Sequence, residues 1–308
     1  MNKENGFPGG VWPVMLTPFL DNGEIDETGL RALTEFYIGS GVRGLFAACQ
    51  SSEIFHLNLE ERLKIARITV ETARGRVPVI ASGNTSETLE EQARELREMA
   101  ALGVDAVVLL SNRLAKQDEG SEVWIENLHR LLEQLEPALK LGMYECPYPY
   151  KRVLAREELQ AMIDSGRFYF VKDTSCDAAL IRERIEQLRG TKLKLFNANT
   201  TTLLETLRAG ADGYCGVMAN FHPELYVWLS ENLNSENAEP VSRLLSICAL
   251  IERQLYPVNA KWSLSRLRGV PISDYSRVQD CAGLTETYQK EVRNMEALVR
   301  QAYRMYCT

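Results

Sequence analysis

The stretch FYFVKDT, residues 168–174, is one of eight short apolar runs that alternate with longer charged segments of helical period. Runs that are apolar on both faces are typical of parallel strands, which are covered by helices on one side and by a core on the other. The other seven runs share this composition and are residues 10–19, 44–49, 77–82, 106–111, 141–146, 193–197 and 213–219.

The segments between the runs have the pattern of amphipathic crossover helices, as in residues 58–73, 85–102 and 177–188. Asp26, Ser86 and Asp177 are candidate helix caps. Eight successive strand–helix units predict an α/β fold, a (β/α)₈ TIM barrel. The G-x-G-x-x-G motif that would indicate an open dinucleotide-binding sheet is absent from the sequence.

The predicted organisation is a catalytic barrel over residues 1–232 and a C-terminal helical extension over residues 233–308, packed on the barrel. Three helical stretches are expected in this extension, and they are residues 240–255, 258–267 and 284–306.

Composition excludes several classes of protein. The 35 Lys+Arg and 42 Asp+Glu residues give a formal net charge of -7. The sequence has no dense basic stripe, so we expect no nucleic-acid partner. No apolar stretch approaches the length of a membrane span, and the first residues lack the apolar region of a signal peptide, so we expect a cytoplasmic protein without a membrane partner. The seven cysteines form no C-x-x-C pair, which favours reduced thiols.

Chemistry in such barrels lies at the C-terminal ends of the strands, where Lys172 is the most unusual residue. With a side-chain period of two, Phe168, Phe170 and Lys172 share the face that points into the barrel. Burial disfavours the ammonium form of a lysine, and a neutral amine can attack a ketone. The structural alternative is a lysine paired with Asp173 or with a loop carboxylate.

Two neighbouring strand ends carry further candidates. Tyr144 follows the fifth run and could shuttle protons, although a phenol there is equally often a hydrogen-bonded cap of the core. After the second run, Gln50, Ser51 and Ser52 offer hydroxyls and backbone amides that suit a carboxylate, or form an ordinary serine-rich turn.

Taken together, these motifs resemble the dihydrodipicolinate synthase and N-acetylneuraminate lyase family, which is pyruvate-dependent and of class I aldolase type. The resemblance covers essentially the whole chain. It rests on Leu16-Thr17-Pro18-Phe19 with Gly23-Glu24-Ile25-Asp26, on Tyr144 with Pro147, on Phe170-Val171-Lys172-Asp173-Thr174-Ser175, and on Asp212-Gly213 through Ala219-Asn220.

The resemblance implies a lyase, an aldolase or a dehydratase, in which Lys172 forms an imine with pyruvate or a sugar-derived 2-oxo acid. Tyr144 would then relay protons, and Ser51 and Ser52 would hold the substrate carboxylate. The family needs no metal and no cofactor beyond this imine, and its members are usually homotetramers built as dimers of dimers.

The chain departs from the family at several positions. Gln50 stands where the family has a relay threonine, and Asn112 and Arg113 stand where it has paired tyrosines. Pro149 falls where true dihydrodipicolinate synthases have an arginine, which argues against lysine biosynthesis, and Glu145 replaces a common asparagine. We therefore include Gln50, Arg113 and Cys215 among the candidate substrate-binding residues.

Two alternatives to the lyase remain open at this point. One is a degenerate family member that binds a 2-oxo acid as a sensor or regulatory protein. The other is a metal-dependent barrel, for which four cysteines near the predicted strand ends could supply thiolates, but these lack a short-spacing motif, and we expect no metal. These cysteines are Cys49, Cys146, Cys176 and Cys215.

Overall fold

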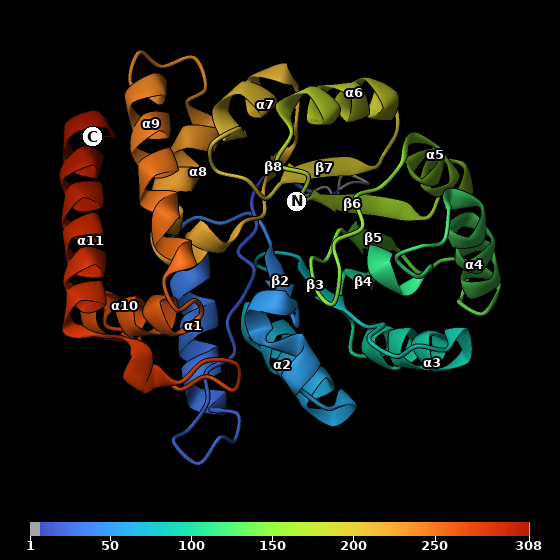
Figure 1. Cartoon of the computed structure of the whole chain (residues 1–308), viewed down its shortest axis with the longest axis horizontal. Helices are drawn as coiled ribbons and strands as arrows, with labels where there is room; N and C mark the ends of the chain where they lie inside the picture. Colours follow the sequence, from blue (N-terminus) through green and yellow to red (C-terminus); the bar gives the residue numbers. More distant parts are fainter. Residues whose placement is uncertain (1–6, 308) are drawn as a thin grey trace.

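A computed structural model describes residues 7–307 and shows eight parallel strands in one curved sheet, surrounded by helices (Figure 1). The order of the strands in this sheet is β1-β8-β7-β6-β5-β4-β3-β2. The strands are β1 (Gly10–Val11), β2 (Leu45–Ala47), β3 (Val79–Ser82), β4 (Ala106–Leu110), β5 (Leu141–Tyr144), β6 (Phe168–Asp173), β7 (Lys194–Asn197) and β8 (Gly213–Tyr214).

The two end strands of this ladder are linked through the segment that follows β1. The Phe46 amide donates to the Pro13 carbonyl (3.0 Å), and the Met15 amide donates to the Phe46 carbonyl (3.0 Å). The sheet therefore curls round on itself, in an α/β arrangement of the TIM-barrel type.

Two predicted strands are much shorter than their apolar runs. The run at residues 10–19 forms a strand only over Gly10–Val11, because Pro13 and Pro18 have no amide hydrogen to donate to a ladder. The run at residues 213–219 ends as a strand at Tyr214 and turns into a short 3₁₀ helix over Val217–Asn220.

Several of the crossover helices begin at a residue whose side chain caps the first turn. Asp26 accepts from the Gly29 amide (2.9 Å), and Asp177 accepts from the Ala179 amide (2.9 Å), as predicted. The predicted cap Ser86 is wrong, because Thr88 caps α3 and Ser86 instead binds a glutamate of that helix. These helices are α1 (Glu27–Gly39), α2 (Leu59–Ala73), α3 (Leu89–Ala100), α4 (Ser121–Glu133), α5 (Arg156–Ser165), α6 (Ala178–Leu188), α7 (Leu203–Ala209) and α8 (Pro223–Glu231).

The interior of the curved sheet is filled by large aromatic side chains. Phe170 and Phe196 stack with ring centroids 4.4 Å apart, and Trp12 lies 5.3 Å from Phe170. All three are fully buried. A second apolar layer packs between the sheet and the helices, so the core has the two layers that a barrel of this type requires.

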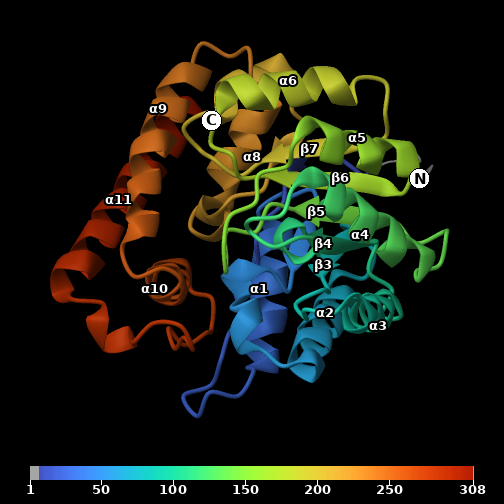
Figure 2. The same cartoon turned by 45° about the vertical axis from the view of Figure 1, so that its right-hand side comes forward.

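Residues 238–306 form three further helices, which lie on one side of the curved sheet near α1 and α8 (Figures 1 and 2). The first is shorter than the predicted 240–255 stretch, since it ends at Cys248 and continues as a 3₁₀ turn. Within residues 7–307, no helix has both the length and the apolarity needed to cross a membrane. The three helices are α9 (Ala238–Cys248), α10 (Val258–Arg268) and α11 (Glu286–Tyr306).

Candidate active site

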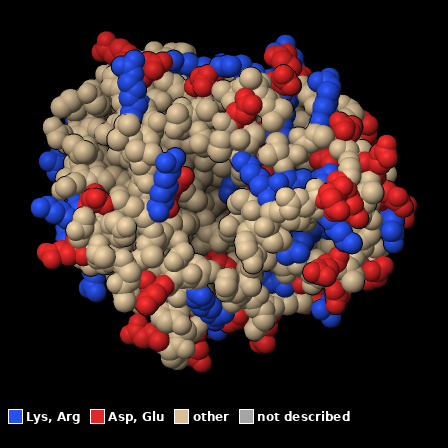
Figure 3. All heavy atoms as spheres, in the orientation of Figure 1, with Lys and Arg blue, Asp and Glu red and all other residues tan. Residues whose placement is uncertain are grey.

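Lys172 lies at the wall of a cavity of about 410 Å³ beyond the C-terminal ends of the strands. The molecular face drawn in Figure 3 is hollowed near its centre. The lining residues are Gln50, Ser51, Glu53, Ile54, Phe55, His56, Tyr144, Pro147, Tyr148, Lys172, Val217, Tyr256, Pro257, Val278 and Gln279.

Lys172 is only 4% exposed and faces aromatic rings rather than an acid. Its Nζ atom lies 4.1 Å from the ring centroid of Tyr144 and 5.9 Å from that of Phe46. Over the described part of the chain, no ion pair or hydrogen bond of this ammonium group is found. The structural alternative, a pairing with Asp173, is therefore wrong.

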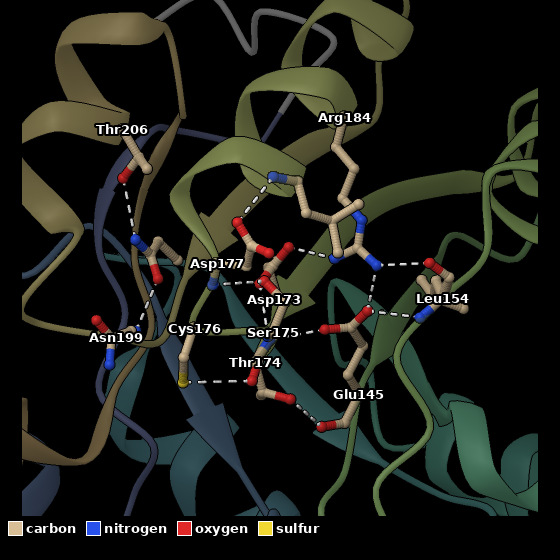
Figure 4. A network of polar contacts seen from close by, with 12 residues as sticks. Glu145, Leu154, Asp173, Thr174, Ser175, Cys176, Asp177, Arg184, Asn199 and Thr206 are labelled. Atoms are coloured by element: carbon tan, nitrogen blue, oxygen red, sulfur yellow. Dashed lines mark hydrogen bonds and ion pairs between the residues drawn. The ribbon is translucent and has the colours of Figure 1, made fainter.

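Asp173 is turned away from Lys172 because successive side chains of a strand point to opposite faces. It forms an ion pair with Arg184 of α6, and its Oδ1 atom accepts from the Ser175 amide (2.8 Å). Arg184 also donates to Glu145 Oε1 (2.6 Å), so one guanidinium joins two buried carboxylates (Figure 4).

This Glu145–Asp173–Arg184 cluster holds the loops that follow β5 and β6. Glu145 accepts from the Thr174 amide (2.7 Å) and from the Leu154 amide (2.7 Å). Burial raises the pKa of Glu145, whereas the Arg184 guanidinium favours its ionised form. Glu145 therefore positions the strand end that carries Lys172 and does not face the cavity.

Tyr144 is the immediate neighbour of Lys172, since the two residues are register partners on β5 and β6. Burial raises the pKa of Tyr144 well above its ordinary value, so the phenol is protonated at neutral pH. A neutral phenol above an amine can donate a proton and then take it back.

The thiols around this pair are also neutral. Burial raises the pKa of Cys146 to about 11 and that of Cys215 to about 12. Cys215 is fully buried in the same core cluster as Tyr144 and is not among the residues that line the cavity. Within residues 7–307, no group of three or more His, Cys, Asp or Glu side chains could hold a metal ion.

The two predicted serines have different surroundings. Ser51 lines the cavity, as does Gln50. The Ser52 hydroxyl donates to the Met15 carbonyl (2.6 Å) and accepts from the Cys49 amide (3.0 Å), so its polar capacity is used within the turn.

A tyrosine from the C-terminal segment completes this side of the cavity. The Tyr256 side chain lies close to that of Ser51, and its hydroxyl accepts from Asn220 Nδ2 (2.8 Å). Asn220 in turn accepts from the Tyr37 hydroxyl (2.5 Å). Sequence reasoning missed Tyr256, because no local pattern marks it and only the packing of the extension brings it to the strand ends.

Arg113 lies outside the cavity, although it supports one wall of it. Its guanidinium carbon lies 5.4 Å from the ring centroid of Phe55, which does line the cavity. The adjacent Asn112 donates to the carbonyls of Cys146 (2.9 Å) and Tyr148 (2.8 Å) and so fixes the loop after β5. Lys151 is exposed on that loop.

A second buried lysine anchors the C-terminal segment over the cavity. Lys261 of α10 donates to Glu53 Oε1 (2.6 Å) and to the Tyr275 carbonyl (2.8 Å). The other Glu53 oxygen accepts from the Arg277 amide (2.6 Å) and from Ser276 (3.1 Å). These bonds place Val278 and Gln279 at the cavity wall.

Comparisons with known proteins find similarity over nearly the whole chain. The model of the dihydrodipicolinate synthetase family matches residues 7–299. A 4-hydroxy-tetrahydrodipicolinate synthase of Marinobacter nauticus is 25% identical over 262 residues, which are 84% of this chain and 88% of that protein.

Solved structures share the fold at low identity. A catalytic lysine mutant of the Ruminococcus gnavus sialic acid aldolase has a TM-score of 0.86 and 18% identity. The match covers 99% of this chain and 100% of that chain. An E. coli K12 prophage protein of the dihydrodipicolinic acid synthase family, solved with pyruvate, has a TM-score of 0.82 and 22% identity over 96% of this chain and 98% of that chain.

Proposed function

Because the chain belongs to the dihydrodipicolinate synthetase family, we propose that it is a Schiff-base-forming lyase acting on pyruvate or another 2-oxo acid through Lys172. One observation carries this proposal. Lys172 is a buried lysine without a carboxylate partner, next to a neutral phenol, at the wall of a cavity large enough for a small substrate.

In the proposed mechanism the neutral Lys172 amine attacks the C2 carbonyl of the 2-oxo acid, and loss of water gives an imine. The protonated imine accepts the electron pair that is released when a bond to C3 breaks, which leaves an enamine. Tyr144 moves the protons, since its hydroxyl-bearing ring lies against Lys172. Reprotonation of C3 and hydrolysis of the imine return the free lysine.

The substrate carboxylate is assigned to the Ser51 side of the cavity. Ser51 and Tyr256 present two adjacent side chains with hydroxyl groups there. Gln50 adds an amide, which binds but does not relay protons as a hydroxyl does. No metal takes part in this proposal, and the covalent imine is the only cofactor-like species.

The remaining assignments follow from the family. We propose a homotetramer, built as a dimer of dimers, that works in the cytoplasm. Pro149 stands in the loop after β5 where true dihydrodipicolinate synthases have an arginine, so we do not propose lysine biosynthesis as its role.

The test is to incubate the protein with pyruvate, reduce it with borohydride and digest it for mass spectrometry. An adduct is expected on the peptide that contains Lys172, and none is expected on the peptide that contains the buried Lys261. Absence of an adduct on Lys172 would overturn the proposal. An adduct without turnover of any 2-oxo acid would instead support the alternative that the protein binds a 2-oxo acid as a sensor or regulatory protein.

A further inference from the structure

The charges of the cavity lining are already neutralised or committed to other tasks. Three lining residues can carry a formal charge near neutral pH, and they are Glu53, His56 and Lys172. Both Glu53 oxygens are bound by Lys261, Ser276 and the Arg277 amide. His56 is exposed at the rim, and Lys172 is taken up by the imine.

No arginine stands in the lining as described. The nearby guanidinium of Arg113 lies against Phe55, outside the cavity. The Arg277 guanidinium binds both oxygens of Glu61 (2.6 and 3.0 Å).

Part of the cavity lining is apolar and includes an aromatic pair. Phe55 and Tyr148 pack with ring centroids 4.9 Å apart, and Tyr148 is 51% exposed. An aromatic pair open to a cavity provides surface that a ligand can cover. The other apolar lining residues are Ile54, Pro147, Val217, Pro257 and Val278.

The lining therefore offers two kinds of surface, hydroxyl groups of Ser51, Tyr256 and Tyr144 and the apolar wall formed by the Phe55 and Tyr148 rings. Its volume of about 410 Å³ exceeds what a three-carbon acid needs. The second part of the substrate thus lies against the apolar wall, where an unpaired charge would lose its hydration without gaining a partner.

We infer that the acceptor substrate is an uncharged aldehyde with an apolar group of aryl size. This inference rests on the lyase function proposed above and names its substrate class. The pyruvate enamine forms a bond from its C3 atom to the aldehyde carbon, and the aldehyde oxygen takes a proton and becomes a hydroxyl. Water then hydrolyses the imine and releases a 4-hydroxy-2-oxo acid, so the reaction joins one pyruvate and one aldehyde without an oxidant or reductant.

The experiment compares three aldehydes with pyruvate as the common donor. They are benzaldehyde (apolar), glyceraldehyde (hydroxylated) and succinate semialdehyde (anionic). We expect kcat/KM for benzaldehyde to exceed the other two values by about tenfold or more. Faster turnover of either polar aldehyde, or trapping of pyruvate with no turnover of benzaldehyde, overturns the inference. Failure of the lyase proposal itself is distinguishable, because it leaves no turnover of any of the three aldehydes, with or without borohydride trapping of pyruvate on Lys172.

Substitutions of the apolar wall sharpen the experiment. Phe55→Ala is expected to lower the benzaldehyde-to-glyceraldehyde ratio of kcat/KM by about tenfold. Val278→Arg introduces a guanidinium into the wall and is expected to raise the relative activity on succinate semialdehyde, whereas the size control Val278→Met is not. Unchanged ratios in both Phe55→Ala and Val278→Arg would overturn the assignment of the aldehyde to this wall.

Discussion

Two buried lysines lie near the C-terminal ends of the strands, Lys172 on β6 and Lys261 on α10, and their contacts differ. Lys261 is fully buried, and its ammonium group is 2.6 Å from Glu53. Lys172 is 4% exposed and contacts the ring of Tyr144, with no carboxylate within ion-pair distance among residues 7–307. Burial alone therefore does not identify a reactive lysine. The absence of a counter-ion and the presence of a cavity distinguish Lys172 from Lys261.

The carboxylates near the strand ends resemble Lys261 in having ion-pair partners. Glu53, Glu145 and Asp173 all lie at strand ends, but each is neutralised by Lys261 or Arg184. A buried ion pair of this kind fixes geometry at a cost in desolvation. The protein thus surrounds one amine that has no ion-pair partner among the described residues with charge pairs that hold the loops around it.

The largest expected effect is that of Lys172→Met on turnover. We expect kcat to fall by about 10⁴-fold or more, because the nucleophile is lost, and borohydride trapping to disappear. Stability in urea is expected to be unchanged or higher, since a buried polar group without an ion pair or hydrogen bond among the described residues is replaced by an apolar side chain. Retained turnover in this variant would show that Lys172 is not the reactive lysine.

Tyr144→Phe is expected to separate proton transfer from imine formation. Turnover should fall by about 10²- to 10⁴-fold, because the neutral phenol beside Lys172 is the proposed proton carrier. Trapping of pyruvate on Lys172 should persist, and the comparison of the two assays on one preparation is the measurement. Full turnover by this variant would remove Tyr144 from the mechanism.

Lys261→Met is expected to damage stability rather than chemistry. It leaves Glu53 buried without its counter-ion, which costs about 3–5 kcal/mol in the free energy of unfolding. Urea denaturation measures this loss, and the double variant Lys261→Met/Glu53→Gln should recover part of it. If Lys261→Met lost trapping at Lys172 while remaining folded, the two lysines would not have separate roles.

The sequence was sufficient for the parts of the fold and site that depend on local pattern. The order of the strands and the adjacency of Tyr144 and Lys172 follow from periodicity and from the rule that consecutive strands pair in a barrel. The partner of a side chain does not follow in this way. The contacts of Asp173 with Arg184 and of Tyr256 with Ser51 depend on three-dimensional packing between distant segments.

The smallest expected effect concerns Ser51 and Ser52, which repeat the contrast of the two lysines. Ser51→Ala removes a hydroxyl that lines the cavity, so we expect KM for pyruvate to rise about tenfold, the equivalent of one hydrogen bond, with a smaller change in kcat. Ser52→Ala removes a hydroxyl bonded to the Met15 carbonyl and should lower stability by about 1 kcal/mol while leaving KM nearly unchanged. Steady-state kinetics and urea denaturation of both variants decide the matter. The reverse pattern, with KM raised only in Ser52→Ala, would move the carboxylate site from the cavity wall into the turn behind it.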